Sequence, residues 1–304
     1  MTSKICVLLA AYNGEKYIES QLESILNQQN AELDIYISLD LSTDNTLEII
    51  DKYKETHPNI ILLEYGKRFG SSGQNFFHLL QSVDFSGYNY IAFADQDDIW
   101  LPEKFSTAIQ SIKQHNVDGY SGNVTAFWPN GKKQLIKKDS PQVEFDYLFE
   151  SAGPGCTFVM TRALAFAIQQ LLTQKPEGIA NLWLHDWFCY SFARSKGYKW
   201  FIDASPYVLY RQHDNNQIGA RKGIRAFLYR IKTILSGDGF DKVLKQADYL
   251  EQCEYPVQLI NLKNAISFIK LAFIGKKCRR RNNEKMYFTF AVIILILKRQ
   301  KLYP

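Results

Sequence analysis

An apolar segment that ends in acidic residues most constrains how this chain can fold. It runs from Tyr90 to Ala94, and three of the next four residues are Asp95, Asp97 and Asp98. Five apolar or aromatic residues in succession suit a strand that is buried on both faces of a parallel sheet, and Pro102 suits the first turn of a following helix. The carboxylates therefore follow the carboxyl end of a strand, where ligands bind in open α/β sheets.

The three aspartates repel one another unless a positive charge or hydrogen-bond donors lie among them. A hard divalent cation such as Mg²⁺ or Mn²⁺ neutralises such a cluster, often together with the phosphates of a substrate. The alternative is a solvated acidic loop that caps the next helix. The motif alone leaves both interpretations open.

Strands and helices alternate regularly before this motif. Apolar runs predict strands at 4–11, 33–39 and 60–65, and apolar residues at helical spacing predict helices at 15–26, 47–53 and 74–83. This order predicts an α/β fold with a mainly parallel, doubly wound, Rossmann-like sheet and right-handed crossovers. We therefore expect residues 1–100 to form a nucleotide-binding half of a domain that extends to residue 216.

The pattern is less regular over residues 101–216, the remainder of this domain. We expect helices at 103–114, from Ala163 and at 182–196, and strands at 120–128, 134–138, 157–161 and 207–213. Gly153 and Gly155 permit close approach of a ligand, although a tight turn would use them equally well. Asp186 stands near the start of a helix, where it is either a reactive acid or a cap stabilised by the helix dipole.

Two basic side chains end the last of these strands. Arg211 and His213 are two residues apart and therefore face the same side of the strand. Such a pair could meet a diphosphate or a metal ion, whereas a single histidine is more often a hydrogen-bonded core residue. Both interpretations of His213 remain open at this point.

The cysteines and the N-terminus indicate the compartment. The five cysteines are scattered singly, which favours neither a disulfide framework nor a zinc site. The first residues lead directly into a short strand and lack the apolar core of a signal peptide. We expect a cytoplasmic protein in a reducing compartment.

Taken in order, these motifs resemble the inverting family 2 glycosyltransferases of the A-type fold, particularly the bacterial rhamnosyltransferase-like branch. The motifs that carry the resemblance are Ala10–Gly14, Ile37–Thr46, Asp95–Trp100, His185–Trp187 and Tyr210–His213, with Asn216 and Gly219 beyond them. Each is weak by itself, and the five in order are specific. The resemblance covers roughly residues 4 to 219, and it implies that residues 101–216 form the acceptor-binding half of the domain.

The resemblance implies an activity and a cofactor. The enzyme is expected to transfer a sugar from dTDP-rhamnose or a UDP-hexose, with inversion, to a hydroxyl of a glycan or lipid-linked oligosaccharide. The expected setting is bacterial surface polysaccharide synthesis, as O-antigen or capsule. A Mg²⁺ or Mn²⁺ ion would act as Lewis acid and template for the departing diphosphate, and a base would take the proton of the acceptor hydroxyl.

The resemblance also assigns residues to these roles. Asp186 matches the general base. The metal ligands implied are Asp97, Asp95 and His213, and the nucleotide-sugar contacts are Ala10, Tyr12, Asp40, Asp95, Gln96 and Arg211. Contacts to the acceptor or sugar are expected from Asp98, Trp100, Gly155, His185 and Trp187.

One motif departs from the family pattern. The family usually shows Asp-Asp-Gly-Ser where this chain has Leu39-Asp40-Leu41-Ser42. Asp40, which matches the acid that reads the pyrimidine, is kept, but Leu41 replaces a glycine that allows positive φ or tight packing against the base. A catalytically weakened nucleotide-sugar-binding or scaffold protein of the same fold is therefore the alternative.

Residues 217–304 differ electrostatically from the rest of the chain. They hold 18 Lys and Arg against 6 Asp and Glu, a net charge of +12, whereas residues 1–216 carry −7. We expect a helical extension with a basic cluster at Lys276–Arg281, an apolar stripe within Ile224–Leu235 and an apolar run at Tyr287–Leu297. That run is too short to span a bilayer, which needs about 20 helical residues.

Two interpretations of this basic extension remain open. It could lie on the anionic inner face of the cell membrane, or its helices could pack on the catalytic domain or on a second subunit as a homo-oligomer. Nucleic-acid binding is disfavoured by its apolar content. A dinucleotide-dependent oxidoreductase is disfavoured because Ala10–Tyr17 lacks Gly-x-Gly-x-x-Gly.

Overall fold

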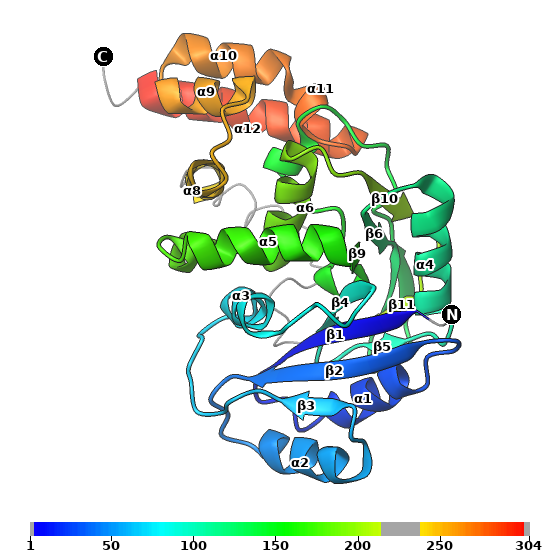
Figure 1. The fold of residues 1–304 in the computed structure, drawn as a ribbon. Coiled ribbons are helices and arrows are strands. Elements are labelled where there is room, and N and C mark those ends of the chain that lie inside the picture. The colour runs from blue at the N-terminus through cyan, green and yellow to red at the C-terminus, as the bar shows by residue number, and fades with distance from the viewer. Residues whose placement is uncertain (1–2, 214–237, 301–304) are drawn as a thin grey trace. The chain divides into compact units, whose positions relative to one another are not determined.

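The computed structural model describes residues 3–213 and 238–300, and the backbone alone for residues 297–300 (Figure 1). The chain divides into two compact units. The first comprises Met1–Asp139 and Ala152–Gln217, and the second comprises Ser140–Ser151 and Ile218–Pro304. Asn216, Gly219 and the stripe within Ile224–Leu235 lie outside the described residues.

A seven-stranded sheet forms the centre of the first unit. Its strands are β1 (Lys4–Ala11), β2 (Glu32–Leu39), β3 (Ile60–Leu62), β4 (Tyr90–Asp95), β6 (Gly119–Gly122), β9 (Val159–Thr161) and β10 (Trp200–Asp203), in the spatial order β10-β6-β9-β4-β1-β2-β3. All run parallel except β9, which pairs antiparallel with both β4 and β6. The expected mainly parallel α/β sheet is confirmed.

Helices cover both faces of this sheet (Figure 1). They are α1 (Ile18–Leu26), α2 (Thr46–Thr56), α3 (Ser72–Ser82), α4 (Lys104–His115), α5 (Arg162–Gln174) and α6 (His185–Ser195). Alternate residues of β1 such as Val7 join a core with α1, α2 and α4. On the other face, the Phe76 ring of α3 contacts Phe93 of β4, with ring centroids 5.2 Å apart. Burial on two sides explains why β1 and β4 are apolar throughout.

A second, smaller sheet contains the strands whose boundaries the sequence pattern predicted least accurately. It consists of β5 (Ile99–Trp100), β7 (Val124–Phe127), β8 (Lys133–Ile136) and β11 (Val208–Arg211), in the order β5-β11-β7-β8. The strand expected at 120–128 is in fact two strands, one in each sheet, separated at Asn123. The buried Asn123 amide donates to the carbonyl of Ala204 at 2.7 Å and to Asp139 at 3.1 Å. A side chain that replaces ladder hydrogen bonds in this way lets the chain change sheets.

Other boundaries also differ from expectation. β3 ends at Leu62 instead of Tyr65, and the strand expected from Thr157 begins at Val159 because Gly155–Thr157 forms a 3₁₀ turn. β10 was not expected at all. Its four residues are too few for a clear period-2 pattern.

The second unit is helical in its described part. Its helices are α8 (Asp238–Tyr249), α9 (Tyr255–Leu262), α10 (Ala265–Phe273), α11 (Gly275–Cys278) and α12 (Asn282–Gln300), with a 3₁₀ turn at Asp146–Leu148. Within residues 3–213 and 238–300, no helix combines the length and the apolar character that crossing a bilayer requires.

The segment Ser140–Ser151 supplies acidic partners for the basic cluster at Lys276–Arg281. The buried Arg280 pairs with Asp146 at 3.5 Å and with Glu150 at 3.3 Å, and Lys277 pairs with Glu144 at 2.8 Å. Breaking a buried pair leaves an uncompensated charge, which is strongly destabilising. Part of the cluster therefore holds the second unit together.

Gly73 allows a close approach that an alanine would prevent. A Cβ at this position of α3 would collide with the main-chain carbonyl of Trp183, which cannot rotate away as a side chain could. We predict that Gly73→Ala lowers the free energy of unfolding by about 1–3 kcal/mol, as overpacking does, despite the better helix propensity of alanine. Urea unfolding measures this change. A Cβ at Gly87 would meet no atom within 4 Å, so equal losses for Gly73→Ala and Gly87→Ala would contradict the prediction.

Candidate functional site

The carboxyl ends of β1, β2 and β4 meet at one edge of the large sheet. Ala10 lies opposite Asp95 in the β1–β4 register, and Ala11 lies opposite Leu39 in the β1–β2 register. The chain continues from β1 to β2 and β3 on one side of β1, whereas β4 lies on its other side. This is a topological switch point, at which open α/β sheets form a ligand crevice.

The Gln96 side chain fastens the loop after β4 to the loop after β1. Its Oε1 accepts from the backbone N–H of Tyr12 at 2.8 Å, and its Nε2 donates to the Tyr12 carbonyl at 2.8 Å. A Cβ at Gly14 would collide with this amide. Both functional groups of Gln96 are therefore engaged within the protein, while the Tyr12 side chain is 49% exposed.

Asp40 organises the glycine-rich segment Gly66–Gly73. Its carboxylate accepts from the backbone N–H groups of Leu41 at 2.8 Å, Phe69 at 3.0 Å and Gly70 at 2.9 Å. Leu41 is not among the described residues with positive φ. The backbone conformation here therefore does not require the glycine that the family usually has at this position.

The polar turn after β2 is tied to the turn after β1. Asn13, at φ 44°, accepts from the Thr43 N–H at 2.8 Å and donates its own N–H to the Ser42 hydroxyl at 3.0 Å. The Gly14 N–H donates to Thr46 Oγ1 at 2.7 Å. These contacts join the two loops that surround Asp40.

Strand β11 brings Arg211 and His213 against the acidic motif. His213 Nε2 lies 2.7 Å from Asp97 Oδ2. Arg211 donates its Nε–H to the Asp97 carbonyl at 2.8 Å and its backbone N–H to Asp98 Oδ1 at 3.1 Å. The antiparallel pairing of β11 with β5 fixes this arrangement. The two residues thus reach the acids from the small sheet.

A group of buried side chains lies next to the partly buried Asp95 and Asp97. Asp98, Trp100 and Lys104 are at most 2% exposed, and Lys104 Nζ lies 3.4 Å from the centre of the Trp100 ring. Burial lowers the pKa of Lys104 to about 7. Nothing in the sequence predicts this lysine, because a lysine in the first turn of a helix ordinarily extends into solvent.

Asp95, Asp98 and Cys156 form the tightest set of potential metal-ligating atoms among the described residues, all within 4.8 Å of one another. Burial, followed by the charges of Asp97 and Asp186, raises the pKa of Asp95 to about 8. Burial and the charge of Asp98 hold the pKa of the Cys156 thiol well above its ordinary value. A protonated thiol is a poor ligand for a hard cation, so the carboxylates are the better donors.

Gly155, His185 and Asp186 meet beside α6. A Cβ at Gly155 would collide with His185 Nε2 and would lie 3.4 Å from the Asp186 Cβ. The buried His185 ring stacks on Phe76 at 3.7 Å between centroids, and neither ring nitrogen has a hydrogen-bond partner among the described residues. The half-buried Asp186 accepts from the Trp187 N–H at 2.6 Å. The negative charge of Asp186 on α6 contributes to the raised pKa of Asp95 at the end of β4. The two carboxyl groups therefore interact electrostatically.

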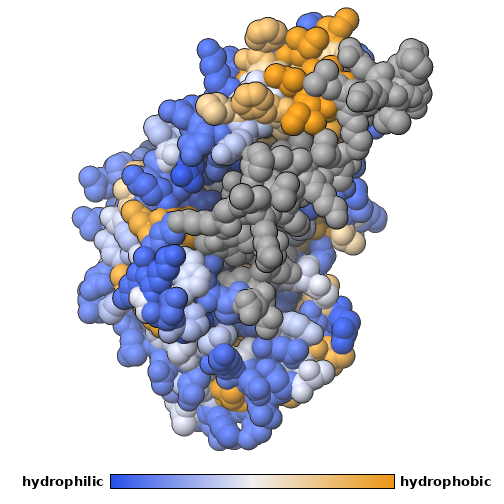
Figure 2. Space-filling model, turned by 180° about the vertical axis from the view of Figure 1, so that it is seen from behind, coloured by the Kyte–Doolittle hydropathy of each residue, from blue (hydrophilic) through white to orange (hydrophobic). Residues whose placement is uncertain are grey.

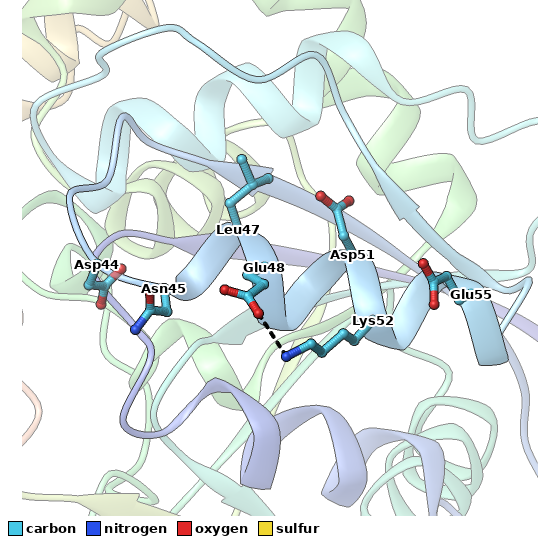
Figure 3. A pocket seen from close by; sticks show the side chains of 7 residues that line it. All are labelled: Asp44, Asn45, Leu47, Glu48, Asp51, Lys52 and Glu55. Atoms are coloured by element: carbon cyan, nitrogen blue, oxygen red, sulfur yellow. Dashed lines mark ion pairs between the residues drawn. The ribbon is translucent and has the colours of Figure 1, made fainter.

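The surface hollow in Figure 3 is a separate feature. It has a volume of about 500 Å³ and is lined by Asp44, Asn45, Leu47, Glu48, Asp51, Lys52 and Glu55. All of these belong to α2 or to the two residues before it, and an ion pair of 2.8 Å joins Glu48 to Lys52. The hollow contains none of the candidate residues, and it lies along one helix instead of at the strand ends.

Comparison with known proteins relates this arrangement to enzymes. Residues 6–166 match glycosyl transferase family 2. Over 289 residues the chain is 40% identical to the dTDP-rhamnosyl transferase RfbG of Shigella flexneri, covering 95% of this chain and 100% of that protein. Over 162 residues it is 26% identical to the UDP-Glc:alpha-D-GlcNAc-diphosphoundecaprenol beta-1,3-glucosyltransferase WfgD of Escherichia coli, covering 53% of this chain and 61% of WfgD.

A solved structure shares the fold. The crystal structure of S. aureus TarS 1-349 in complex with UDP-GlcNAc superposes with a TM-score of 0.54, covering 96% of this chain and 89% of that chain. The sequence identity is 15%, so this likeness concerns the fold alone.

His185 should make stability depend on pH. Burial lowers its pKa from 6.5 to about 3, so below pH 6.5 the unfolded chain binds a proton that the folded chain does not. Its contribution to stability is therefore present above pH 6.5 and is lost as the pH falls towards 3, by up to about 1.4 kcal/mol per pH unit.

We predict that His185→Leu flattens the fall in unfolding free energy between pH 6.5 and 4, measured by urea unfolding at several pH values. His115→Leu, at an exposed position of α4, controls for the loss of a histidine as such. An unchanged slope in His185→Leu would contradict the prediction.

Proposed function

The chain belongs to glycosyl transferase family 2, and from this membership we propose that it transfers rhamnose from dTDP-rhamnose to a hydroxyl of a lipid-linked glycan, with inversion. The assignment of dTDP-rhamnose as the donor rests on the 40% identity to a dTDP-rhamnosyl transferase over 95% of this chain. The acceptor is supported by the more distant similarity to an enzyme whose name specifies a diphosphoundecaprenol-linked sugar.

In this proposal the nucleotide lies at the ends of β1 and β2. The exposed Tyr12 ring offers a surface for the base, Ala10 lines the floor, and Asp40 accepts from the pyrimidine. A carboxylate has about four lone-pair sites, so the three N–H groups that Asp40 already binds leave it capacity for one more donor. Gln96 contributes by holding the Tyr12 backbone, and Arg211 supplies positive charge beside the diphosphate.

We assign the metal ion to Asp97, with Asp95 and His213 beside it. The donor set fits Mg²⁺ or Mn²⁺, since carboxylate oxygens crowd at this point. Burial, followed by the charges of Asp97 and Asp186, raises the pKa of the Asp95 carboxyl, and a cation would relieve this. When bound, the cation would stabilise the charge that develops on the departing diphosphate. The Asp97–His213 pair fixes the orientation of both side chains, and Arg211 holds the Asp97 main chain.

Asp186 is the proposed general base. It is half-buried, and the absence of a side chain at Gly155 leaves room for the ring of the neighbouring His185 at the start of the same helix. The proton of the acceptor hydroxyl would pass to the Asp186 carboxylate as the oxygen attacks the anomeric carbon from the face opposite the diphosphate. His185 remains neutral at physiological pH and so does not compete for the proton.

Four residues expected at the acceptor or sugar receive a supporting role instead. Asp98 and Trp100 are at most 2% exposed. His185 stacks on Phe76, and Trp187 is buried in the first turn of α6. We propose that Asp98 and Trp100 brace the metal-binding loop from behind, and that His185 and Trp187 fix the start of α6 and with it Asp186.

We predict that Asp186→Asn lowers kcat by about 10²–10⁴-fold, the usual contribution of a general base, while dTDP-rhamnose binds with unchanged affinity. Initial rates of dTDP release and calorimetric titration of the donor measure the two quantities. Asp51→Asn, an exposed substitution on α2, should leave both unchanged. Retention of more than about a tenth of wild-type kcat would remove Asp186 from this role.

We predict that Asp97→Asn abolishes the metal-dependent part of donor binding. In the wild type, dTDP-rhamnose with Mg²⁺ or Mn²⁺ should raise the thermal midpoint, because a ligand that binds only the folded state stabilises it. The variant should show no difference with and without the cation. If UDP-glucose served as donor with an equal kcat/KM, the assignment of dTDP-rhamnose would fail even though the metal assignment stood.

A further inference from the structure

Two exposed hydrophobic side chains lie in the loops around Asp40. On the face shown in Figure 2, the surface of the first unit is mainly hydrophilic, with hydrophobic residues in small patches. The large hydrophobic side chains exposed in the described part of this unit are Tyr12, Leu41, Leu135, Phe166 and Trp183. Single exposed apolar residues are normal at a protein surface. Tyr12 and Leu41 differ from the others because their loops, after β1 and β2, enclose a buried carboxylate.

Main-chain contacts hold Leu41 beside the Asp40 carboxylate. The Leu41 N–H donates to Asp40 Oδ1 at 2.8 Å. The hydroxyl of the next residue, Ser42, accepts from the N–H of Asn13 at 3.0 Å, and Asn13 directly follows Tyr12 in the chain. Leu41 therefore stands between the acid and the loop that carries the exposed Tyr12 ring.

The side chain of Leu41 is not part of the hydrophobic core. Leu39, two residues earlier, is 2% exposed and belongs to the core of the large sheet, whereas Leu41 is 36% exposed and does not belong to it. The apolar atoms of Leu41 are therefore in contact with solvent at the rim of the site. Covering them with an apolar group of a ligand is favourable.

Thymine and uracil differ at a position that such a side chain can sense. Both bases present the same N3–H and the same two carbonyls, so the hydrogen bond proposed for Asp40 does not distinguish them. They differ in the methyl group at C5, which lies in the plane of the ring beside the C4 carbonyl. Tyr12, stacked on the base, would face the ring of either base. Leu41 follows Asp40 directly, with Cα atoms about 3.8 Å apart, and so lies along the edge of the base that Asp40 binds.

We propose that Leu41 packs against the C5 methyl group of thymine and makes the site prefer a thymine nucleotide to a uracil nucleotide. The inference rests on the proposed function, in which the base lies at Asp40 and Tyr12. It separates two tasks within the nucleotide site. Asp40 binds a pyrimidine that has an N3–H, and Leu41 selects between the two pyrimidines that have one.

Calorimetric titration with dTDP and dUDP in the presence of Mg²⁺ tests this inference, because these two nucleotides differ in the methyl group alone. The wild type should bind dTDP about fourfold more tightly than dUDP, or better, as burial of one methyl group predicts. Leu41→Ala should reduce this ratio to less than about twofold by weakening dTDP, with the affinity for dUDP unchanged. Leu135→Ala, at a leucine of β8 that is 44% exposed, should preserve the wild-type ratio.

Two kinds of result would overturn the inference and leave the proposed function standing. One is a wild-type ratio near one, or a ratio that Leu41→Ala does not change, although both nucleotides bind. The other is an equal weakening of dTDP and dUDP in Leu41→Ala, which would assign Leu41 to the structure of the loop instead of to base selection. If neither nucleotide bound to the wild type, the donor site of the proposed function would fail together with the inference.

Discussion

The structure of the first unit depends on how it accommodates the acidic residues at the end of β4. Asp95, Asp97 and Asp98 follow a strand that is buried on both faces, so the sheet places their charges at the border of its own core. Three elements far apart in the sequence meet them. β11 brings Arg211 and the His213 that follows it, and α4 brings Lys104. The 3₁₀ turn Gly155–Thr157 before β9 brings the Cys156 thiol, which hydrogen-bonds to Asp98. The small sheet therefore holds basic partners beside these acids.

The sequence was sufficient for the parts of the fold that repeat a simple pattern. β1 and β4 were found because apolar runs such as Ile5–Ala11 have no polar side, which only a doubly covered strand allows. The location of the acids followed from the same reasoning, since parallel strands end at one edge of a sheet. The roles of these residues in binding and catalysis remain proposals.

Features that depend on a single side chain in a tertiary setting could not be predicted. Asn123 divides one apparent strand between two sheets through its buried amide. The residues around it have a strand-like pattern, which does not indicate a break. Gln96, which the resemblance implies as a nucleotide-sugar contact, holds the backbone of Tyr12 with its side-chain amide. Lys104 is buried against Trp100, contrary to what its position in a first helical turn suggests. In each case the deciding contact joins residues distant in sequence, whereas propensity and periodicity report only on neighbours.

The way in which Ser140–Ser151 joins the second unit has a consequence for biosynthesis. Arg280 meets Glu150 across 130 residues of chain, and the acidic segment leaves the ribosome long before its basic partners are made. Until then the Asp146 carboxylate, which is fully buried in the finished protein, has no Arg280 to receive it. The second unit can thus be completed only after synthesis of α11 and α12, and a single cut between residues 217 and 218 would leave its acidic portion attached to the wrong half.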